Sequence, residues 1–264
     1  MRDAEADLVH RPLTEAFAGL VRSLGGAFED LASHAFARCP SLPIPGANGI
    51  LDHGDDERPV VEAITPMLEA IGRDGTTPWI VTFEGRRRVV EEAARLGLHG
   101  DHANAGMVLE AGSFVPAAPP AGVNVTFPTD AGALDGAGRL FAEAFDLPPE
   151  LFAPLYRPSY LERVDPRIVL VLDRTEPVST AIAWPVDGAV GIFSVATPPR
   201  QRGRGFGAIA TSAAVQAGFD VGASRAFLQA SVMGEGIYRR LGFREVSRYL
   251  FLGPPGDEPA ATAD

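Results

Sequence analysis

The chain of 264 residues contains no lysine, and all 23 of its basic residues are arginine. The absence of lysine excludes a P-loop lysine, a Schiff-base lysine and any lysine nucleophile. Histidine is confined to the first 102 residues, at His10, His34, His53, His99 and His102. Chemistry encoded in the second half therefore has to proceed without a histidine that is close in sequence.

Cysteine is almost absent as well, since Cys39 is the only one. A single cysteine excludes an intrachain disulfide and a cysteine metal cluster, and we expect no metal. No segment has the length and apolar purity of a membrane span, and the first residues lack the apolar core of a signal peptide. We therefore expect a cytoplasmic protein without a membrane partner.

The charge balance is acidic, with a formal net charge of −11 and a sequence pI near 4.9. This balance argues against nucleic acid as a partner and is compatible with a cationic acceptor such as an amine. The hydrophobic fraction of 46% is typical of a folded globular protein with a sizeable core.

Alternating helix and strand patterns in the second half predict a mixed α/β domain. The spacing predicts helices over 131–145, 206–219 and 234–242, and strands over 167–172, 179–185, 188–197, 225–231 and 244–252, with a hairpin turn at 173–177. By contrast, the proline- and glycine-rich segment 40–59 in the first half is predicted to be a loop region.

A glycine-rich loop, RQRGRGFG at 200–207, separates the strand ending near 197 from the helix starting near 206. Gly203, Gly205 and Gly207 lack Cβ atoms, so the backbone can curl close to a ligand and present consecutive amides at a helix N-terminus. That arrangement suits a pyrophosphate. A plain turn and a basic RNA-contacting tag are the alternatives, and the G-x-G-x-G spacing fits the dinucleotide-binding fingerprint poorly.

Two motifs resemble the GNAT superfamily of N-acetyltransferases. The segment 195–207, VATPPRQRGRGFG, resembles the family's acetyl-CoA loop, with Arg202, Gly205 and Gly207 in the preferred register and Arg200, Gly203 and Gly205 in a second one. The segment 231–243, SVMGEGIYRRLGF, is similar to the family's Asn-x-x-Ala-x-x-x-Tyr-x-x-Leu-Gly-Phe helix. The resemblance covers about 126–252.

The resemblance implies roles for individual positions. The loop amides would hold the CoA pyrophosphate, the end of the preceding strand would pair with the pantetheine arm, and the amide of Val195 would face the thioester carbonyl. Tyr238 occupies the position of the tyrosine acid that protonates the departing thiolate. The implied cofactor-binding residues are Val195, Ala196, Thr197, Arg202, Gly203, Arg204, Gly205, Phe206, Gly207, Ala208 and Ser231.

Two positions depart from the family pattern. Ser231 stands where the family usually has Asn, which weakens or replaces a side-chain contact to CoA. Gly234 stands in place of Ala, which loosens the start of that helix and leaves room for the ligand. No general base is evident, because the acidic candidates Glu143, Glu162 and Asp187 are typical of solvated surface charges.

The first half contains a partial copy of the second. Ala94-Arg-Leu-Gly-Leu98 resembles Arg239-Arg-Leu-Gly-Phe243, and Gly97 and Gly242 lie 145 positions apart, each with a strand upstream and downstream. This pattern predicts a tandem duplication, with chance similarity as the alternative. At the same offset, Ala93 stands opposite Tyr238 and 57–62 opposite the glycine loop, so we predict that the first copy binds no CoA.

These observations predict tandem GNAT-like domains of the α/β class, with mixed, mostly antiparallel sheets flanked by helices and a CoA cleft in the C-terminal domain. The predicted boundaries are 1–113 for a degenerate first domain, 114–128 for a linker, 129–253 for the catalytic domain and 254–264 for a disordered tail. The expected activity is transfer of an acetyl group from acetyl-CoA to a primary amine, on a small molecule or on a peptide or protein N-terminus. A non-catalytic acyl-CoA-binding sensor or partner-binding module is the alternative, and a homodimer is left open.

Overall fold

The computed structural model describes residues 5–100 and 103–255 of the chain. It divides into two compact units. The first unit comprises residues 1–106 and 245–264, and the second comprises residues 107–244. Strand β5 (Ala103–Glu110) carries the chain from the first unit into the second.

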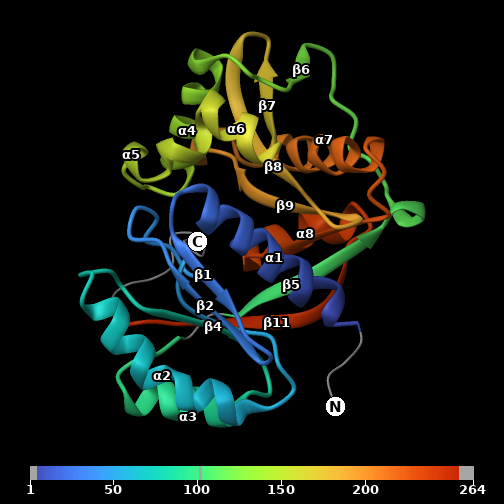
Figure 1. Cartoon of the computed structure of the whole chain (residues 1–264). Coiled ribbons are helices and arrows are strands. Elements are labelled where there is room, and N and C mark those ends of the chain that lie inside the picture. The colour runs from blue at the N-terminus through green and yellow to red at the C-terminus, as the bar shows by residue number, and fades with distance from the viewer. Residues whose placement is uncertain (1–4, 101–102, 256–264) are drawn as a thin grey trace. The chain divides into compact units, whose positions relative to one another are not determined.

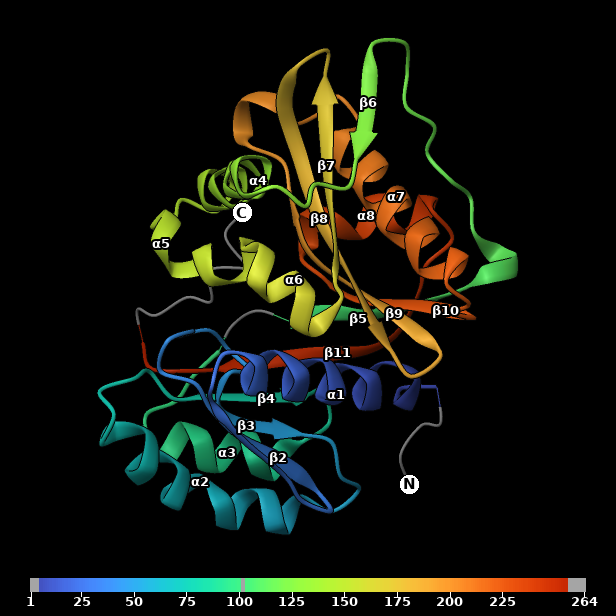
Figure 2. The ribbon, with the colours of Figure 1, turned by 45° about the horizontal axis from the view of Figure 1, so that its top comes forward.

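The first unit is built on five strands in the order β1 (Ala27–Asp30), β2 (His34–Arg38), β3 (Asn48–Asp52), β4 (Trp79–Phe83) and β11 (Arg244–Leu252). Strands β3 and β4 run parallel, and the other neighbouring pairs are antiparallel. Helix α1 (Asp7–Ser23) covers one face of these strands, and α2 (Glu57–Gly72) and α3 (Arg87–Arg95) cover the other (Figures 1 and 2).

Helix α2 shows why this unit has a core. Its buried residues are Val60, Ile64, Met67 and Ile71, which recur every three or four positions and so form one apolar face. That face packs with Ile50 of β3 and Ile80 of β4 in one cluster of buried side chains. Burial of each such side chain stabilises the fold by about 1.5–3 kcal/mol.

The second unit contains β6 (Val123–Thr126), β7 (Arg167–Asp173), β8 (Glu176–Val186), β9 (Ala189–Ala196) and β10 (Arg225–Ala230), which are neighbours in the order β10-β9-β8-β7-β6. Strands β6 to β9 are antiparallel, and β9 and β10 are parallel. Its helices are α4 (Ala131–Ala144), α5 (Pro149–Phe152), α6 (Pro158–Val164), α7 (Phe206–Asp220) and α8 (Val232–Arg240), with short 3-10 turns η1 (Ala111–Ser113), η2 (Ala153–Tyr156) and η3 (Pro199–Gln201). Helices α4 and α7 lie on either side of the strands (Figure 2).

The mixed α/β class and each helix and strand predicted for the second half are confirmed, with bounds that differ by a few residues. The hairpin turn between β7 and β8 is also present, and Arg174 within it has a φ of 58°. In the first half, the prediction that residues 40–59 form a loop region is wrong. This segment contains β3, whose five residues are all buried.

The compact units divide the chain at other positions than the predicted domains. Part of the predicted linker, 114–128, forms β6 and pairs with β7. The last strand, β11, lies in the first unit because Tyr249–Leu252 pair with Ile80–Phe83 of β4 and His99 bridges Gly253. The predicted tail, 254–264, falls outside the described residues from 256 onward.

Helices α3 and α8 support the predicted duplication. Their bounds correspond at the same 145-residue offset, and each is followed by a leucine and then by a glycine of positive φ, 85° at Gly97 and 100° at Gly242. The amide of Leu98 donates to the carbonyl of Ala93, and that of Phe243 donates to the carbonyl of Tyr238, as expected for equivalent helix ends. The order strand, helix, strand, helix, strand is also shared by β3 to β5 and by β9 to β11.

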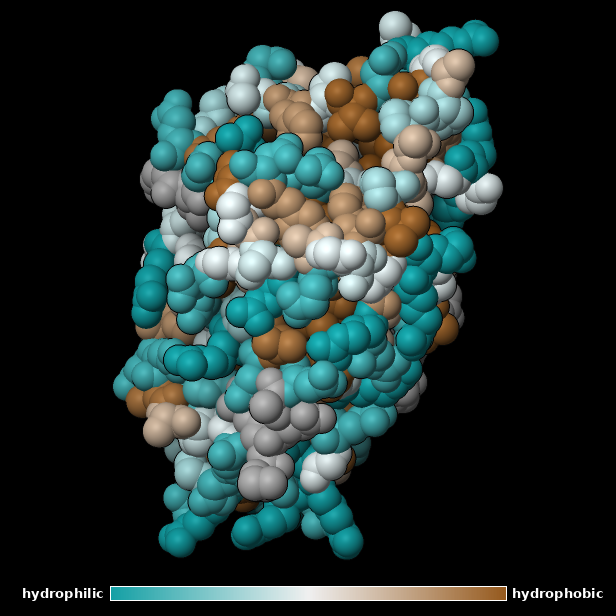
Figure 3. Space-filling model, turned by 90° about the vertical axis from the view of Figure 1, so that its right-hand side faces the viewer, coloured by the Kyte–Doolittle hydropathy of each residue, from teal (hydrophilic) through white to brown (hydrophobic). Residues whose placement is uncertain are grey.

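The large hydrophobic side chains exposed in the described part of the chain are Leu31, Val115, Phe127, Val221, Val232 and Met233. On the face shown in Figure 3, hydrophobic residues lie in separate groups among hydrophilic ones. Across residues 5–100 and 103–255, no helix is long and apolar enough to cross a membrane.

Candidate active site

Strands β9 and β10 separate partway along their length. They pair in parallel only through Ala189–Gly191 of β9 and Arg225–Phe227 of β10, although β9 continues to Ala196 and β10 to Ala230. Beyond Gly191, the edge of β9 that faces β10 therefore has backbone groups without a strand partner. Such an edge can receive an extended ligand as an added strand.

Two aromatic rings stand at the point where the strands separate. Phe193 of β9 and Phe227 of β10 meet edge to face, with centroids 6.0 Å apart. A Cβ on Gly191 would lie 2.4 Å from the Phe193 ring and 2.8 Å from the Phe227 ring. Glycine at position 191 is therefore required for these two rings to pack across the strands.

The free part of β9 contains a bulge. Thr180 of β8 pairs with Ala196, but Ile182 pairs with Phe193, so two residues of β9, Ser194 and Val195, lie opposite one residue of β8. Ser194 has a φ of 51°, which is a left-handed conformation that serine rarely adopts inside a strand. A bulge leaves backbone groups outside the ladder. Val195 therefore lies in a part of β9 that has no partner on the β10 side and a bulge on the β8 side.

The glycine loop connects β9 to α7. Gly203 and Gly205 have φ values of 77° and 85°, and a Cβ on either would have no atom within 4 Å. In the described part of the chain, the amides of 203–208 donate no backbone hydrogen bond, and the first bond of α7 runs from Ile209 to Gly205. Six consecutive amides at the positive end of a 15-residue helix are thus available to an anion.

The arginine side chains of the loop contact protein groups. Arg202 donates from Nε to the carbonyl of Thr197 at 3.1 Å and from Nη2 to that of Ala144 at 3.0 Å. Arg204 donates to Gln201 Oε1 at 2.6 Å and to Asp173 Oδ2 at 2.5 Å, and its guanidinium lies 4.6 Å from the centre of the Phe206 ring. These contacts indicate that the arginines shape the loop and leave anion binding to its amides.

The remaining predicted residues lie close around the loop. Ala196 is buried, and its carbonyl accepts a hydrogen bond from Ser179 Oγ, which also bonds Thr197 Oγ1 at 2.9 Å. A Cβ on Gly207 would lie 3.3 Å from Thr197 Oγ1 and 3.8 Å from Ile237. Gly207, at the start of α7, therefore lies close both to the end of β9 and to α8.

Tyr238 lies on α8 and is 8% exposed. Its ring packs against Phe243 with centroids 5.9 Å apart. Burial raises the pKa of the Tyr238 phenol to about 12, so the phenol is protonated at neutral pH. A Cβ on Gly234 would lie 2.7 Å from Cε2 of this ring, so the glycine that departs from the family pattern makes room for Tyr238 itself.

Ser231 is the N-cap residue of α8, but its side chain makes no capping hydrogen bond. Its hydroxyl is therefore not used by the helix. None of the acidic candidates for a general base is buried: Glu162 and Asp187 are exposed, and Glu143 is exposed and forms an ion pair with Arg200. Within the described ranges, no group of three His, Cys, Asp or Glu residues is placed to hold a metal.

Residues 138–243 match the profile of the acetyltransferase (GNAT) family. This range contains the split strands, the bulge, the glycine loop and Tyr238. Residues 138–243 form a GNAT acetyltransferase domain.

Solved structures resemble the whole chain. A GCN5-related N-acetyltransferase from Kribbella flavida is 23% identical, with a TM-score of 0.74 over 94% of this chain and 96% of that one. One from Sphaerobacter thermophilus is 15% identical, with a TM-score of 0.64 over 98% and 97%. A tandem GNAT protein from the clavulanic acid biosynthesis pathway is 12% identical, with a TM-score of 0.59 over 98% and 97%. A search of curated protein sequences found no match.

The first unit differs from the GNAT domain at the equivalent strand ends. Thr82 Oγ1 of β4 donates to Asp52 Oδ2 of β3 at 2.6 Å, and Arg86 binds both oxygens of Asp52 at 2.7 Å. Side chains therefore bridge β3 and β4 where β9 and β10 are open. Burial raises the pKa of the Asp52 carboxyl, and the hydrogen bonds from Arg86 and Thr82 oppose that rise.

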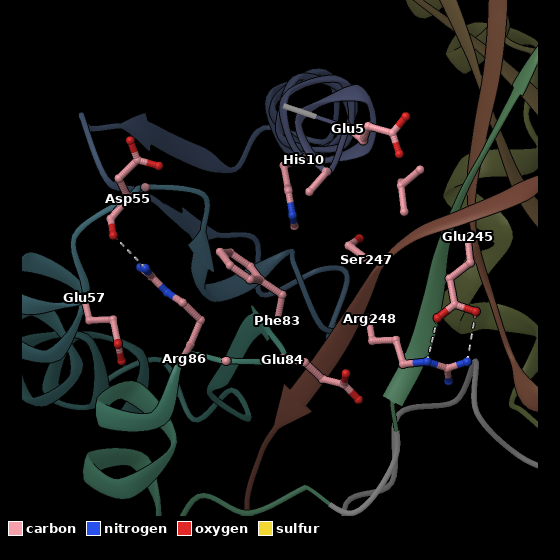
Figure 4. A pocket seen from close by; sticks show the side chains of 14 residues that line it. Glu5, His10, Asp55, Glu57, Phe83, Glu84, Arg86, Glu245, Ser247 and Arg248 are labelled. Atoms are coloured by element: carbon pink, nitrogen blue, oxygen red, sulfur yellow. Dashed lines mark hydrogen bonds and ion pairs between the residues drawn. The ribbon is translucent and has the colours of Figure 1, made fainter. Parts of the chain in front are cut away.

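Carboxylates also occupy the helix starts of the first unit. Asp56 caps α2 by accepting from the amide of Arg58, and Glu57 accepts from the amides of Arg88 and Val89 at the start of α3. The adjoining cavity of about 650 Å³ is lined by five acidic residues, Glu5, Asp55, Glu57, Glu84 and Glu245, and also by Arg86 and Arg248 among others (Figure 4). Carboxylates at the helix starts and the excess of acidic over basic residues in this cavity disfavour a pyrophosphate. That this unit binds no CoA stays a prediction.

Proposed function

We propose that the GNAT domain transfers an acetyl group from acetyl-CoA to a primary amine, on a small molecule or on a peptide or protein N-terminus. The observation that carries the proposal is the run of unbonded amides at 203–208 beside the open edge of β9. Anion-binding amides and a free strand edge are the two features that a pyrophosphate joined to an extended pantetheine requires.

Acetyl-CoA supplies a thioester whose carbonyl carbon the neutral amine attacks directly. Within this domain, the amides of 203–208 bind the pyrophosphate, and the amide of Val195 stabilises the oxyanion that forms on the carbonyl. The C–S bond then breaks, and the thiolate accepts a hydrogen bond and a proton from Tyr238, which water afterwards reprotonates. Since the amine also has to lose a proton and the acidic candidates are exposed, we assign that proton to water.

The high pKa of Tyr238 bears on its role as the acid. A phenol of pKa about 12 is a weaker acid than a free thiol, whose pKa is about 8.5. The same removal from water that raises the phenol pKa also raises the pKa of a thiol beside it, which narrows this gap. Tyr238 is therefore well suited to hydrogen-bond the developing thiolate and to stay protonated until the C–S bond breaks.

The test is an amine panel. Purified full-length protein is incubated with acetyl-CoA and with polyamines, amino acids, aminoglycosides or short peptides, and CoA release is followed with a thiol reagent while mass spectrometry detects acetylated product. We expect turnover on at least one amine class. Binding of acetyl-CoA without turnover on any amine would instead favour a non-catalytic acyl-CoA sensor, and an absence of binding would exclude both functions.

A further inference from the structure

Ser194 stands apart from the other residues with unusual backbone conformation. The non-glycine residues with positive φ in the described chain are Asp146, Asp165, Arg174 and Ser194. The first two lie at the ends of helices and Arg174 lies in a hairpin turn, whereas Ser194 lies inside β9. Such a conformation is unfavourable for serine, and residues of this kind cluster at ligand and active sites. The position of Ser194, directly before Val195, fits that pattern.

A buried phenol reaches the same bulge. Tyr156, the last residue of η2, is 3% exposed, and Ser194 is the polar side chain beside its hydroxyl. Within the described residues, the Tyr156 hydroxyl is buried without a hydrogen-bond partner of normal geometry. An unsatisfied buried hydroxyl is unfavourable, so native proteins retain few of them. Here the hydroxyl lies beside Ser194, which is partly exposed and directly precedes Val195, where the thioester would lie.

The fold holds Tyr156 in this place. Its ring lies against α4, since a Cβ on Gly138 would be 3.1 Å from the Tyr156 ring. The centroids of the Tyr156 and Phe141 rings are 6.4 Å apart. Burial raises the pKa of the Tyr156 phenol above its ordinary value, and the contact with Ser194 lowers it in part. The phenol is thus a neutral hydrogen-bond donor at neutral pH.

We propose that the Ser194 hydroxyl binds the attacking amine and that Tyr156 is a positioning residue that orients this hydroxyl. The inference rests on the proposed function. Tyr156 Oη–H donates to Ser194 Oγ, and the second lone pair of Ser194 Oγ accepts an N–H of the neutral amine. The nitrogen lone pair then points at the thioester carbon beside Val195. The N–C bond forms, the C–S bond breaks, the thiolate takes the proton of Tyr238, the amine nitrogen releases its proton to water, and the Tyr238 phenolate takes a proton back from water.

The experiment compares four variants with wild type in the amine assay. We expect Ser194→Ala to raise KM for the amine about tenfold and Tyr156→Phe about fivefold, each with the acetyl-CoA Kd within twofold of wild type. Because Tyr156 acts through Ser194, the double variant should match Ser194→Ala alone. The control is Tyr160→Phe, another buried tyrosine, whose ring packs on Trp184 at 5.9 Å; its KM should not change.

Ser194→Gly keeps the inference testable if Ser194→Ala folds poorly. Glycine adopts a φ of 51° without strain, so this variant should melt no lower than wild type and still show the raised KM. The inference would be overturned by an unchanged KM in Ser194→Gly, or by equal effects of Tyr156→Phe and Tyr160→Phe on KM. In either case, turnover by the wild-type protein would leave the proposed function intact. A wild-type protein without turnover on any amine would overturn both.

Discussion

All four tyrosines of the chain are buried, with exposed fractions of 3% for Tyr156, 1% for Tyr160, 8% for Tyr238 and 2% for Tyr249. Burial alone therefore does not distinguish a functional tyrosine here. Tyr238 differs from the others by its place on α8. The preceding residue, Ile237, lies against Gly207 at the start of α7. Its removal should affect turnover more than binding.

For Tyr238→Phe we expect kcat to fall by about 10²–10⁴-fold, the range for loss of a general acid, with the Kd for acetyl-CoA within twofold of wild type. Steady-state kinetics and calorimetric titration measure the two quantities. A variant that keeps wild-type kcat would show that the thiolate is protonated by another group.

The raised pKa of Tyr238 also makes stability depend on pH. The folded state keeps this proton up to a pH of about 12, whereas the unfolded chain releases it near pH 10. Above pH 10 the folded state binds more protons, so the free energy of unfolding should decrease with rising pH, by up to about 1.4 kcal/mol per pH unit. Urea unfolding between pH 8 and pH 11 should show this decrease in wild type and a smaller one in Tyr238→Phe. Equal slopes in the two proteins would contradict the assignment.

At the scale of elements, α8 offers a matched pair of glycines. A Cβ at position 234 would lie 2.7 Å from the Tyr238 ring, whereas one at position 236 would meet only Arg240 Nη1, at 3.6 Å. Replacing glycine by alanine in a helix stabilises it by roughly 1 kcal/mol when space allows. We therefore expect Gly236→Ala to raise stability by about this amount with kcat unchanged.

Gly234→Ala should behave in the opposite way, because the ring of Tyr238 has to shift. We expect a loss of about 1–3 kcal/mol in unfolding free energy and a reduced kcat. Thermal unfolding and the amine assay test both variants together. If Gly234→Ala is as stable and as active as Gly236→Ala, the ring does not require that space.

The glycine loop can be tested against another turn. Gly205→Glu should abolish acetyl-CoA binding, since its carboxylate would stand among the amides of 203–208. Gly188→Glu is the control, because Gly188 has a similar φ of 72°, has no atom within 4 Å of its Cβ position and lies in the turn between β8 and β9. It should lose similar stability, by roughly 1 kcal/mol, and keep the wild-type Kd. Retained binding in Gly205→Glu would rule out the loop as the pyrophosphate site.

In the whole molecule, the two units share an order of elements but differ where their parallel strands end. Side chains bridge β3 and β4 in the first unit, whereas β9 and β10 are open in the second. The buried ion pair of Arg86 and Asp52 closes the first unit, with side-chain exposures of 7% and 0%. We therefore expect calorimetry to give one acetyl-CoA per chain. A stoichiometry of two would show that the first unit retains a functional site.

The same ion pair should stabilise the first unit. Arg86→Ala leaves Asp52 buried without its cation, so we expect a loss of about 3–5 kcal/mol in unfolding free energy. The control is Arg87→Ala, which removes an exposed pair with Glu91 and should cost at most about 1 kcal/mol. Acetyl-CoA affinity should be unchanged in every Arg86→Ala molecule that remains folded, and a lost affinity would contradict the division of roles.

The sequence did not predict β6, α5 or α6, but it did predict the other helices and strands of the second half, the glycine loop and the helix that carries Tyr238. These depend on local signals: apolar periodicity, positive-φ glycines and short motifs with fixed spacing. It predicted less of the first half, where β3 lies in a segment rich in proline and glycine. Buried pairing with β2 and β4 outweighs the weak local preference there, and local sequence does not encode that pairing.

The groups that meet at the site could not be predicted from the sequence and are found in the folded chain. The left-handed Ser194, the buried hydroxyl of Tyr156 beside it, and the contact of Gly234 with Tyr238 all depend on residues that sequence spacing does not bring together. Likewise, the arginines of the loop are basic in the sequence, yet the fold turns Arg202 toward the carbonyls of Thr197 and Ala144. The physical reason is that a side chain's partners are set by packing between distant segments, whereas a motif reports only its own backbone.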